Sequence, residues 1–391
     1  MNKHLIALAL AFATHLSVSA AEPIKIGVLT VDSGPFSFLQ SHYIDPAKLA
    51  VEEINKNGGL LGRPVELVMQ SHAGTPATAL AAVARLTQQE KVQFVTGFLT
   101  TGMSMAVAPR IESMNALLLD GSASGDDLTT KTCFSNYFRS MGTDSMVMNV
   151  LRPLIQKSGA KTWSVIASDF ATGHTYASKF EKIVEDSGGS IQTKVFAPLG
   201  TADFGSQVAQ LAAKPADGLA VFVMGSDGIT LAKQQQQFGL FKRFKTVVSS
   251  HFTNEISLPA QGDSTVGVFD AQTYSPEFPA ALNTAFVGEY RKRFNRPPSY
   301  VEAETYQVFE LFRAAVLKAQ SADVQAVRRA MSGLKTATIF GDVEMRAADH
   351  QLVRPMALLQ IEASGAGKGA PVLRNIVAAA DVTPAPVLNC N

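Results

Sequence analysis

Short apolar runs alternate along the chain with segments in which apolar residues recur at helical spacing. The apolar runs lie at residues 24–29, 65–69, 94–96, 116–119, 163–166, 219–224 and 246–249. The helical segments lie at residues 77–89, 103–114, 144–157, 175–187, 204–213 and 229–238. Short, continuous apolar strands separated by helices are typical of parallel sheets that are covered on both faces. The pattern therefore predicts an α/β fold made of two doubly wound halves.

The helix that follows the first strand has two candidate starts. Asp45 suits an N-cap and Pro46 the first helical position, which would begin the helix there. A longer, kinked helix that begins near Phe38 is the alternative. Gly58 and Gly59 supply the left-handed stop that ends the helix before the next strand.

Residues 1–21 have the pattern of a cleavable secretion signal. Lys3 gives a charged start, an apolar stretch covers residues 5–13, and small residues occupy positions 19–21. We expect cleavage after residue 20 or 21. The rival interpretation is a membrane anchor, but the apolar stretch is shorter than the roughly 20 residues needed to span a bilayer. No cysteine follows the cut to carry a lipid, so we expect a periplasmic protein that does not insert into the membrane.

The composition fits a globular protein of two lobes. Hydrophobic residues make up 46% of the 391 residues, which is enough to bury two cores of ordinary domain size. The chain has 34 Lys and Arg residues and 33 Asp and Glu residues. Removal of the signal with Lys3 leaves equal numbers of basic and acidic residues, so the mature chain is near neutral. Nucleic-acid binding depends on clustered positive charge, so we expect no nucleic-acid partner.

Two cysteines, Cys133 and Cys390, lie far apart in the sequence. An exported protein folds in an oxidising compartment, and an even number of cysteines favours a disulfide there. Closing a very long loop also favours the bond on entropic grounds. We therefore predict a disulfide between Cys133 and Cys390.

The loops that follow the strands are the places to search for a ligand. In open parallel sheets, ligands bind beyond the carboxyl ends of the strands, where helix N-termini point at the site. This rule selects residues 30–39, 97–104, 120–126, 168–175, 224–229 and 249–255.

Six strings, taken together and in order, carry a resemblance to a known family. They are IKIGVLTVDSGP, AVEEINKNGGLLGRPVELV, DDLTTKTC, SDFATGHTYASKF, APLGTADFGSQVAQL and DHQLVRPMALLQIE. They resemble the periplasmic binding proteins of ABC importers, of the branched-chain amino acid (Leu/Ile/Val-binding) type, over essentially the whole mature chain. DFATGH and PLGTADF are similar to the branch associated with aromatic and other hydrophobic carboxylates.

The resemblance implies a type I periplasmic binding protein, with two doubly wound parallel-sheet lobes joined by a three-segment hinge. Residues 22–140 plus 274–352 would form lobe 1, and residues 141–273 plus 353–391 would form lobe 2 with the C-terminal tail. The lobes would close on a small-molecule ligand, and an importer's membrane permease would recognise the closed shape. The family plan also implies a monomer.

Hydroxyl groups gather in two of the selected loops of the first lobe. Thr100 and Thr101 stand between a strand and a helix, and Ser122, Ala123 and Ser124 follow the next strand. With the backbone N–H groups beside them, they form a neutral donor cluster that suits a carboxylate. The resemblance implies that Thr101, Ser122 and Ser124 hold a ligand carboxylate. Ordinary helix caps are the alternative interpretation.

The second lobe departs from the pattern of an amino-acid receptor. Thr172 takes a position that is usually aromatic in the family, with Phe170 two residues before it, and Met224, followed by Gly225, takes another. His251 aligns with the acid that pairs with a ligand ammonium. An unpaired buried charge costs several kcal/mol, so the resemblance places an α-amino acid in doubt as the ligand.

The roles of four further residues stay open at this stage. His251 either donates to a second ligand oxygen, or pairs with an acid when charged, or is an ordinary hydrogen-bonding loop residue. Phe36, Phe38 and Tyr274 either form apolar walls of the site or pack in the core or on the hinge.

The motifs of the common enzyme classes do not occur in the sequence. HExxH, CxxC, the P-loop and GxGxxG do not occur, and GMSMA at residues 102–106 departs from GxSxG at its last position. The histidines lack metal-ligand spacing. We therefore predict no catalytic residue, cofactor or metal, and a hydrolase would need a nucleophile and a base that the sequence does not reveal.

The sequence thus predicts a periplasmic receptor that delivers a small hydrophobic or aromatic carboxylate to an ABC importer. A receptor for branched-chain amino acids or their keto acids is the first alternative. A ligand sensor of the same fold, acting on a signalling partner, is the second.

Overall fold

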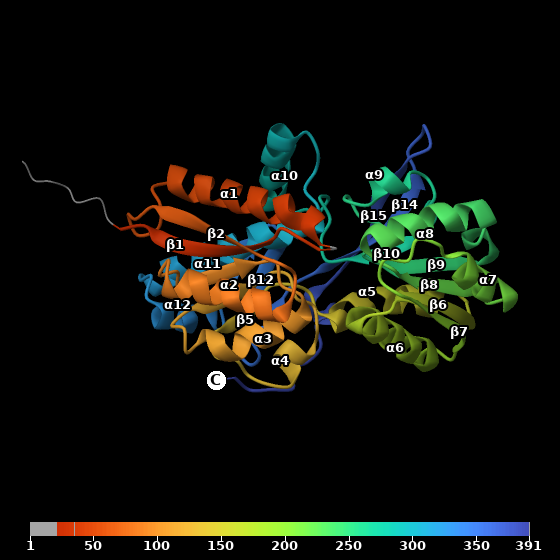
Figure 1. The fold of residues 1–391 in the computed structure, drawn as a ribbon, viewed down its shortest axis with the longest axis horizontal. Coiled ribbons are helices and arrows are strands. Elements are labelled where there is room, and N and C mark those ends of the chain that lie inside the picture. The colour runs from red at the N-terminus through yellow and green to blue at the C-terminus, as the bar shows by residue number, and fades with distance from the viewer. Residues whose placement is uncertain (1–21, 35, 391) are drawn as a thin grey trace, which may run out of the picture.

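The computed structural model describes residues 22–34 and 36–390, so the predicted secretion signal lies outside the described residues. Helices and strands alternate in two α/β lobes that lie side by side (Figure 1). The predicted fold class is confirmed. Within the described part of the chain, no helix is both long and apolar enough to cross a membrane.

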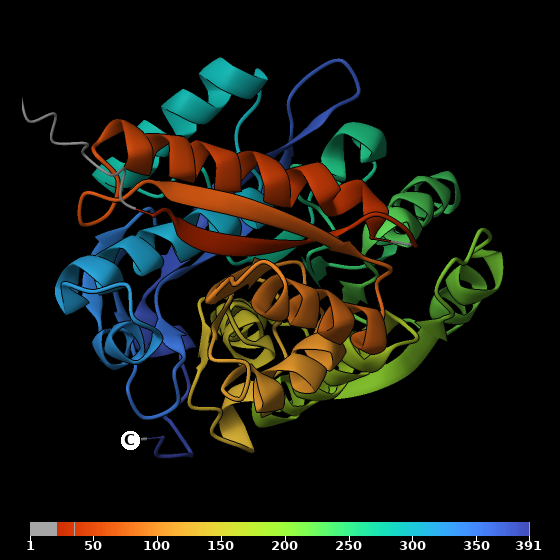
Figure 2. The same cartoon turned by 60° about the vertical axis from the view of Figure 1, so that its left-hand side comes forward.

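The first lobe is built on a five-stranded parallel sheet in the order β2-β1-β3-β4-β5. Its strands are β1 (Ile24–Val31), β2 (Val65–His72), β3 (Phe94–Gly97), β4 (Leu117–Asp120) and β5 (Tyr137–Arg139). The helices between them are α1 (Gln40–Lys56), α2 (Pro76–Gln88), α3 (Thr101–Ile111) and α4 (Asp127–Thr130). Successive residues of a strand face opposite sides, so Val28 packs with α1 while Leu29 packs with α2 and α3. Figure 2 shows α1 running along β1 and β2.

The second lobe is built on a seven-stranded sheet in the order β15-β14-β10-β9-β8-β6-β7. The parallel strands are β6 (Thr162–Ser168), β7 (Ser190–Ala197), β8 (Gly218–Phe222), β9 (Thr246–Ser250) and β10 (Phe269–Gln272). The helices are α5 (Asp144–Lys157), α6 (Ala171–Asp186), α7 (Gly205–Ala213), α8 (Gly225–Phe238), α9 (Leu258–Gln261) and α13 (Ala379–Val382). An antiparallel hairpin of β14 (Met356–Ala363) and β15 (Gly369–Val377) extends the sheet at β10. The alternating pattern did not predict this hairpin, because no helix separates its strands.

The chain passes between the two lobes more than once. After β10 it returns to the first lobe, where α10 (Ala281–Phe294), α11 (Tyr300–Ala319) and α12 (Val324–Met331) pack against the core that contains α1. A small sheet of β11 (Lys335–Thr338), β12 (Gly341–Met345) and β13 (Leu352–Val353) follows on the same side. The chain then enters β14 in the second lobe. The exact lobe boundaries given above stay a prediction.

Arg354 ties two of these passages together. Its guanidinium is fully buried, donates to the carbonyl of Thr273 at 3.0 Å, and pairs with Glu304 of α11. It also lies over the ring of Phe340, 4.1 Å from its centroid. The passages next to the cleft are therefore fixed to the first lobe through a buried ion pair.

Helix α1 begins earlier than the local signal at Asp45 and Pro46 indicates. It starts at Gln40, and Pro46 lies inside it. The start at Pro46 is thus wrong, and the longer alternative is confirmed. The reason is packing, because Leu39 and Tyr43 are buried against Phe98 and the added apolar contact outweighs the local capping signal.

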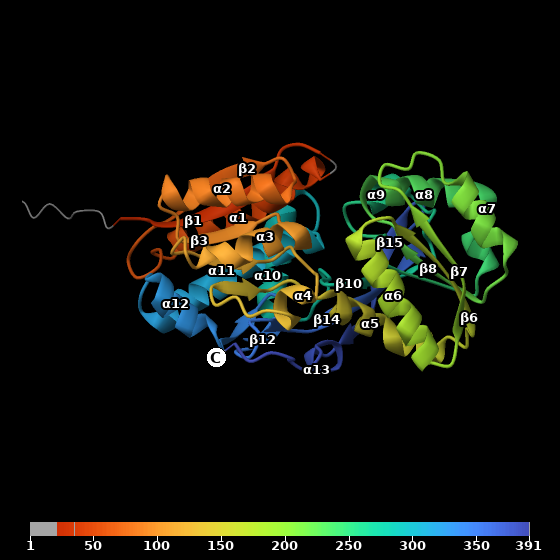
Figure 3. The same cartoon turned by 60° about the horizontal axis from the view of Figure 1, so that its bottom comes forward.

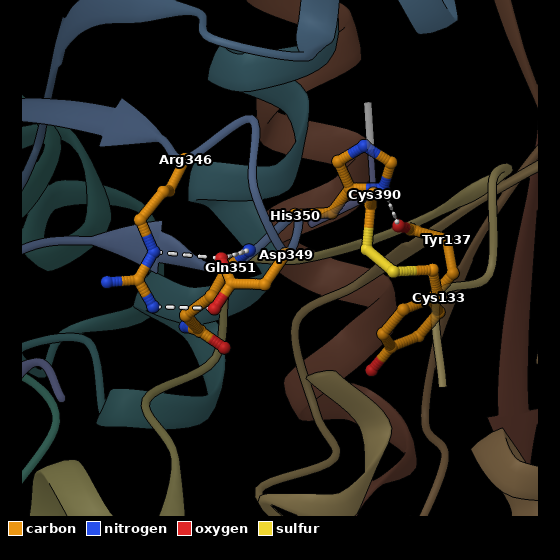
Figure 4. Close-up of a disulfide and its surroundings, with 7 residues drawn as sticks. All are labelled: Cys133, Tyr137, Arg346, Asp349, His350, Gln351 and Cys390. Carbon is orange, nitrogen blue, oxygen red and sulfur yellow. Dashed lines mark hydrogen bonds and ion pairs between the residues drawn. A yellow bond between two sulfur atoms is a disulfide. The ribbon is translucent and has the colours of Figure 1, made fainter. Parts of the chain in front are cut away.

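Cys133 and Cys390 form a disulfide across 257 residues, with Cα atoms 5.4 Å apart (Figure 4). Next to it, His350 Nδ1 donates to the carbonyl of Tyr137 at 3.0 Å. The backbone N–H of Cys390 donates to the carbonyl of Ala348 at 2.7 Å. The predicted disulfide is confirmed, and the end of the tail lies on the first lobe.

Candidate ligand-binding site

A cavity of about 250 Å³ lies between the two lobes. Its walls come from the loops after β3 and β4 in the first lobe and after β6, β8 and β9 in the second. This is where the strand-end rule places a ligand. The volume is close to the lower limit for small-molecule pockets, about 300 Å³, which indicates a small ligand.

Eleven of the twelve residues predicted for the site line this cavity. They are Phe38, Thr100, Thr101, Ser122, Ala123, Ser124, Phe170, Thr172, Met224, Gly225 and His251. Their contacts with a ligand stay a prediction. Phe36, which the sequence left between wall and core, also lines the cavity.

Tyr274 does not line the cavity. It is buried in the core of the first lobe, with its ring against Phe278 and Phe340, and its hydroxyl donates to Asn283 Oδ1 at 2.6 Å. The prediction failed because residue 274 lies beyond β10, on the passage back to the first lobe, where an aromatic side chain fills the core.

Sequence analysis missed several residues that line the cavity. Tyr43, Tyr300 and Glu304 lie on α1 and α11, outside the segments that the strand-end rule selected. Phe98 and Asp227, in contrast, fall inside loops that the strand-end rule had selected. Phe98 and Asp227 could therefore have been predicted from the sequence.

Two hydroxyl groups of the first lobe are held in place by backbone donors. Thr101 Oγ1 accepts the N–H of Gly125 at 3.0 Å, and Ser122 Oγ accepts the N–H of Leu99 at 3.3 Å. The hydroxyl of Tyr43 lies 2.9 Å from Ser122 Oγ. Because an accepted bond leaves a hydroxyl hydrogen available, both side chains can still donate to a ligand.

Two backbone N–H groups of the loop after β4 are bonded inside the protein. Those of Ser122 and Ala123 both donate to Asp120 Oδ1 at 2.9 Å. The carboxyl of Asp120 also accepts the hydroxyls of Ser104 and Tyr137, and burial raises its pKa. These two N–H groups of the predicted donor cluster are therefore bonded inside the protein, whereas the start of α3 has no capping side chain.

Ser124 bonds within the protein through its backbone. Its carbonyl accepts the N–H of Asp144 at 2.8 Å. Burial raises the pKa of Asp144 to about 6. Ser124 thus helps to place the start of α5.

Three helices begin at the cavity without a capping side chain. They are α3 after Thr100, α6 after Phe170 and α8 after Met224. The first N–H groups of a helix have no partner inside it and carry partial positive charge. All three helix starts therefore favour a negatively charged or acceptor-rich ligand.

His251 forms part of the wall on the second lobe. It is only 6% exposed, its Nδ1 lies 2.7 Å from Ser250 Oγ, and its ring centroid lies 4.9 Å from that of Tyr300. Burial lowers the pKa of His251 to about 4, so the imidazole is neutral at neutral pH. Its backbone N–H donates to Asp270 Oδ1 at 3.0 Å, which fixes the loop.

The two carboxyl groups at the cavity differ in their partners. Glu304 pairs with Arg354, so its charge is compensated. Asp227 accepts the N–H of Gly200 at 2.8 Å and lies in the first turn of α8. The described residues that line the cavity include no Lys or Arg.

Apolar side chains cover most of the remaining wall. Phe36 and Phe98 lie 5.4 Å apart between ring centroids, and Phe170, Leu199 and Met224 come from the second lobe. The cavity thus combines apolar walls with hydroxyl groups and a helix start on the first lobe, and with two helix starts, the carboxyl of Asp227 and a neutral imidazole on the second. Among the described residues, no cluster of His, Cys, Asp or Glu could hold a metal ion.

A cavity between two α/β lobes, with helix starts pointing into it, defines a two-lobed solute receptor. The model of the family described as periplasmic binding protein matches residues 23–367, so the chain belongs to that family. Members of the family are solute-binding proteins of ABC transporters and not enzymes. Membership implies a periplasmic location, a small-molecule ligand and a permease partner.

Individual relatives are more distant. The chain is 26% identical to Leu/Ile/Val-binding protein homolog 6 of Brucella suis over 292 residues. This alignment covers 73% of each protein. An amino acid ABC transporter substrate-binding protein from Pseudomonas fluorescens Pf-5 superposes with a TM-score of 0.83, at 22% identity over 94% of this chain and 99% of its own. A solute-binding protein from Rhodopseudomonas palustris BisB5, in complex with 3,4-dihydroxybenzoic acid, gives 0.82 at 23% identity over 92% and 98%. The last two show a shared fold.

Proposed function

We propose that this protein binds a small hydrophobic or aromatic carboxylate between its lobes and delivers it to the permease of an ABC importer. The observation that carries the proposal is the uncapped start of α3, flanked by the hydroxyls of Thr101 and Ser122, at the edge of an apolar cavity. These groups can neutralise a carboxylate by hydrogen bonds alone. The aromatic acid bound by the R. palustris protein of the same fold supports this ligand class.

The second lobe supports a ligand without an ammonium group. The side chain that would face such a group is His251, which is neutral and cannot supply a counter-charge. The apolar residues around it instead favour a ring or an alkyl chain. An aromatic acid thus satisfies both lobes.

A branched-chain amino acid or its keto acid is the second candidate. The observation in its favour is Asp227, whose carboxyl lines the cavity and is the one charge there without a Lys or Arg partner among the described residues. An amino acid would need Asp227 for its ammonium group. In that case Asp227→Asn would abolish binding of leucine, whereas binding of an aromatic acid would persist.

A thermal-shift screen of aromatic acids, branched-chain amino acids and keto acids tests the ligand class. We expect aromatic acids to raise the melting temperature and Thr101→Ala to weaken that effect without unfolding the protein. Thr284→Ala, which alters an exposed hydroxyl on α10, is the matched control. Stabilisation by cations or sugars alone, with none from carboxylates, would overturn the proposal.

Uptake measurements separate an importer from a sensor. Loss of the protein should abolish accumulation of the labelled ligand in cells when it feeds an importer. Unchanged uptake with an altered transcriptional response would favour the sensor. We further propose that the mature protein is a monomer, which its elution on size-exclusion chromatography checks.

A further inference from the structure

Arg139 lies behind the cavity wall, at the end of the last strand of the first lobe. It ends β5, is fully buried, and is not one of the residues that line the cavity. Its guanidinium donates to the carbonyl of Gly125 and the hydroxyl of Thr129, both at 2.5 Å, and to Gln351 Oε1 at 2.6 Å. In the described part of the chain, all the acceptors that bond this guanidinium are neutral. A fully buried arginine usually pairs with an acid, so its bonds here indicate another role.

The bond from Arg139 to Gly125 leads to the cavity. The N–H of Gly125 donates to Thr101 Oγ1 at 3.0 Å, and Thr101 lines the cavity. The two residues also lie in close contact, because a Cβ atom on residue 125 would lie only 2.3 Å from Thr101 Cγ2. Gly125 is therefore held between the guanidinium and Thr101, and a shift of Gly125 would move the Thr101 hydroxyl.

The opposite side of the guanidinium is fixed by Gln351. The amide of Gln351 accepts from Arg139 Nε and donates through Nε2 to the carbonyl of Met141 at 3.0 Å. The backbone N–H of Arg139 donates to the carbonyl of His350 at 2.9 Å. Arg139 thus has a fixed backbone and a fixed side chain. Because a guanidinium is planar and rigid, fixing one edge of it also fixes the Nη1 atom that bonds Gly125.

We propose that Arg139 is a positioning residue for the ligand carboxylate, and that it acts through Gly125 on the hydroxyl of Thr101. This inference rests on the proposed function, in which Thr101 donates to the carboxylate. Arg139 does not touch the ligand. It holds the Thr101 hydroxyl in the geometry that a hydrogen bond to a carboxylate requires.

Arg139→Lys separates the positioning role from the effect of the charge. Lysine keeps the positive charge but lacks the planar fork that reaches three acceptors in fixed directions. We expect this variant to raise the dissociation constant for benzoate about five- to tenfold in calorimetric titration, the effect of one misplaced hydrogen bond. Arg346→Lys is the matched control. Its guanidinium bonds Asp349 and the carbonyl of Pro384 away from the cavity, so benzoate affinity should not change.

A double-mutant cycle with Thr101→Ala tests the path of the effect. When Arg139 acts through Thr101, Arg139→Lys should change benzoate affinity less than about twofold in a Thr101→Ala background. A residue that only supports the fold would weaken binding by the same factor in both backgrounds. Such equal weakening, or wild-type affinity of a folded Arg139→Lys, would overturn the inference.

Thr129→Val gives the same cycle if Arg139→Lys does not fold. It removes the acceptor of Arg139 Nη2 and keeps the guanidinium. We expect benzoate to bind about two- to fivefold more weakly to this variant, and the effect to disappear in the Thr101→Ala background. An effect of the same size in both backgrounds would overturn the inference here too. If the wild type binds no carboxylate at all, the proposed function fails as well.

Discussion

The hydroxyl oxygens of Tyr43 and Ser122 lie 2.9 Å apart at the wall of the cavity, although 79 residues separate them in the sequence. Tyr43 comes from α1, and Ser122 follows β4 on the far side of β3. Ser122 Oγ already accepts the N–H of Leu99. When Tyr43 donates as well, the hydrogen of Ser122 is left to point at a ligand.

Removing the hydroxyl of Tyr43 should therefore weaken carboxylate binding. We expect Tyr43→Phe to raise the dissociation constant for an aromatic acid about three- to tenfold, the usual worth of one hydrogen bond. Titration calorimetry measures this effect. Tyr306→Phe is the matched control, because its hydroxyl bonds to Glu53 away from the cavity. Equal affinities of wild type and Tyr43→Phe would show that Ser122 does not hold the carboxylate.

An ion pair joins the two lobes beside the cavity. Lys179 Nζ on α6 lies 2.6 Å from Asp126 Oδ2, which follows β4, and it also donates to Ser145 Oγ at 2.9 Å. In Figure 3, α4 lies on the side of the first lobe that faces α5 of the second. The pair joins α6 of the second lobe to the loop after β4 of the first, and we expect it to stabilise the arrangement of the lobes in this structure.

We expect Lys179→Met to lower ligand affinity by about two- to fivefold, since a partly exposed ion pair contributes up to about 1 kcal/mol. Lys182→Met, on the exposed side of the same helix, should leave affinity unchanged. Calorimetry at low and high salt gives a second readout. Added salt should lower the ligand affinity of the wild type and not that of Lys179→Met, because salt screens the ion pair. Identical salt responses of the two proteins would show that the pair does not contribute to closure.

The disulfide should affect stability and not affinity. It closes a loop of 257 residues and lies outside the cavity lining. Replacing both cysteines by serine should lower the free energy of unfolding by about 2–5 kcal/mol. Melting curves with and without a reductant check this for the wild type, and the double variant should not respond to the reductant. A loss of affinity at temperatures where the variant stays folded would mean that the tail supports the site.

Local sequence signals determine part of this architecture, and long-range packing determines the rest. The strand pattern predicted two α/β halves. The strand-end rule selected the loops of Thr101, Ser122 and His251, and all three residues line one cavity. Tyr274 was misplaced, because a single aromatic residue fits a core as well as a wall. Tyr43 was missed, because its place depends on how α1 packs against Phe98, which no short sequence segment encodes.

Burial of His251 should make the protein sensitive to acid. The unfolded histidine takes up a proton near pH 6.5, but burial lowers the folded pKa to about 4. The unfolded state therefore binds more protons between these values, so the free energy of unfolding falls as the pH drops below 6.5. Between pH 7 and 5, the free energy of unfolding should fall by about 2 kcal/mol more in the wild type than in His251→Gln. Denaturant titrations at both pH values check this, and parallel losses would mean that His251 is solvated.

Calorimetric titration of the wild-type protein with benzoates and with L-leucine tests the ligand class most directly. Both should be injected into the same preparation, after unfolding and refolding have removed any co-purified ligand. We expect saturable one-to-one binding of an aromatic acid and no heat from leucine. Saturable binding of leucine, with no heat from any aromatic acid, would contradict it.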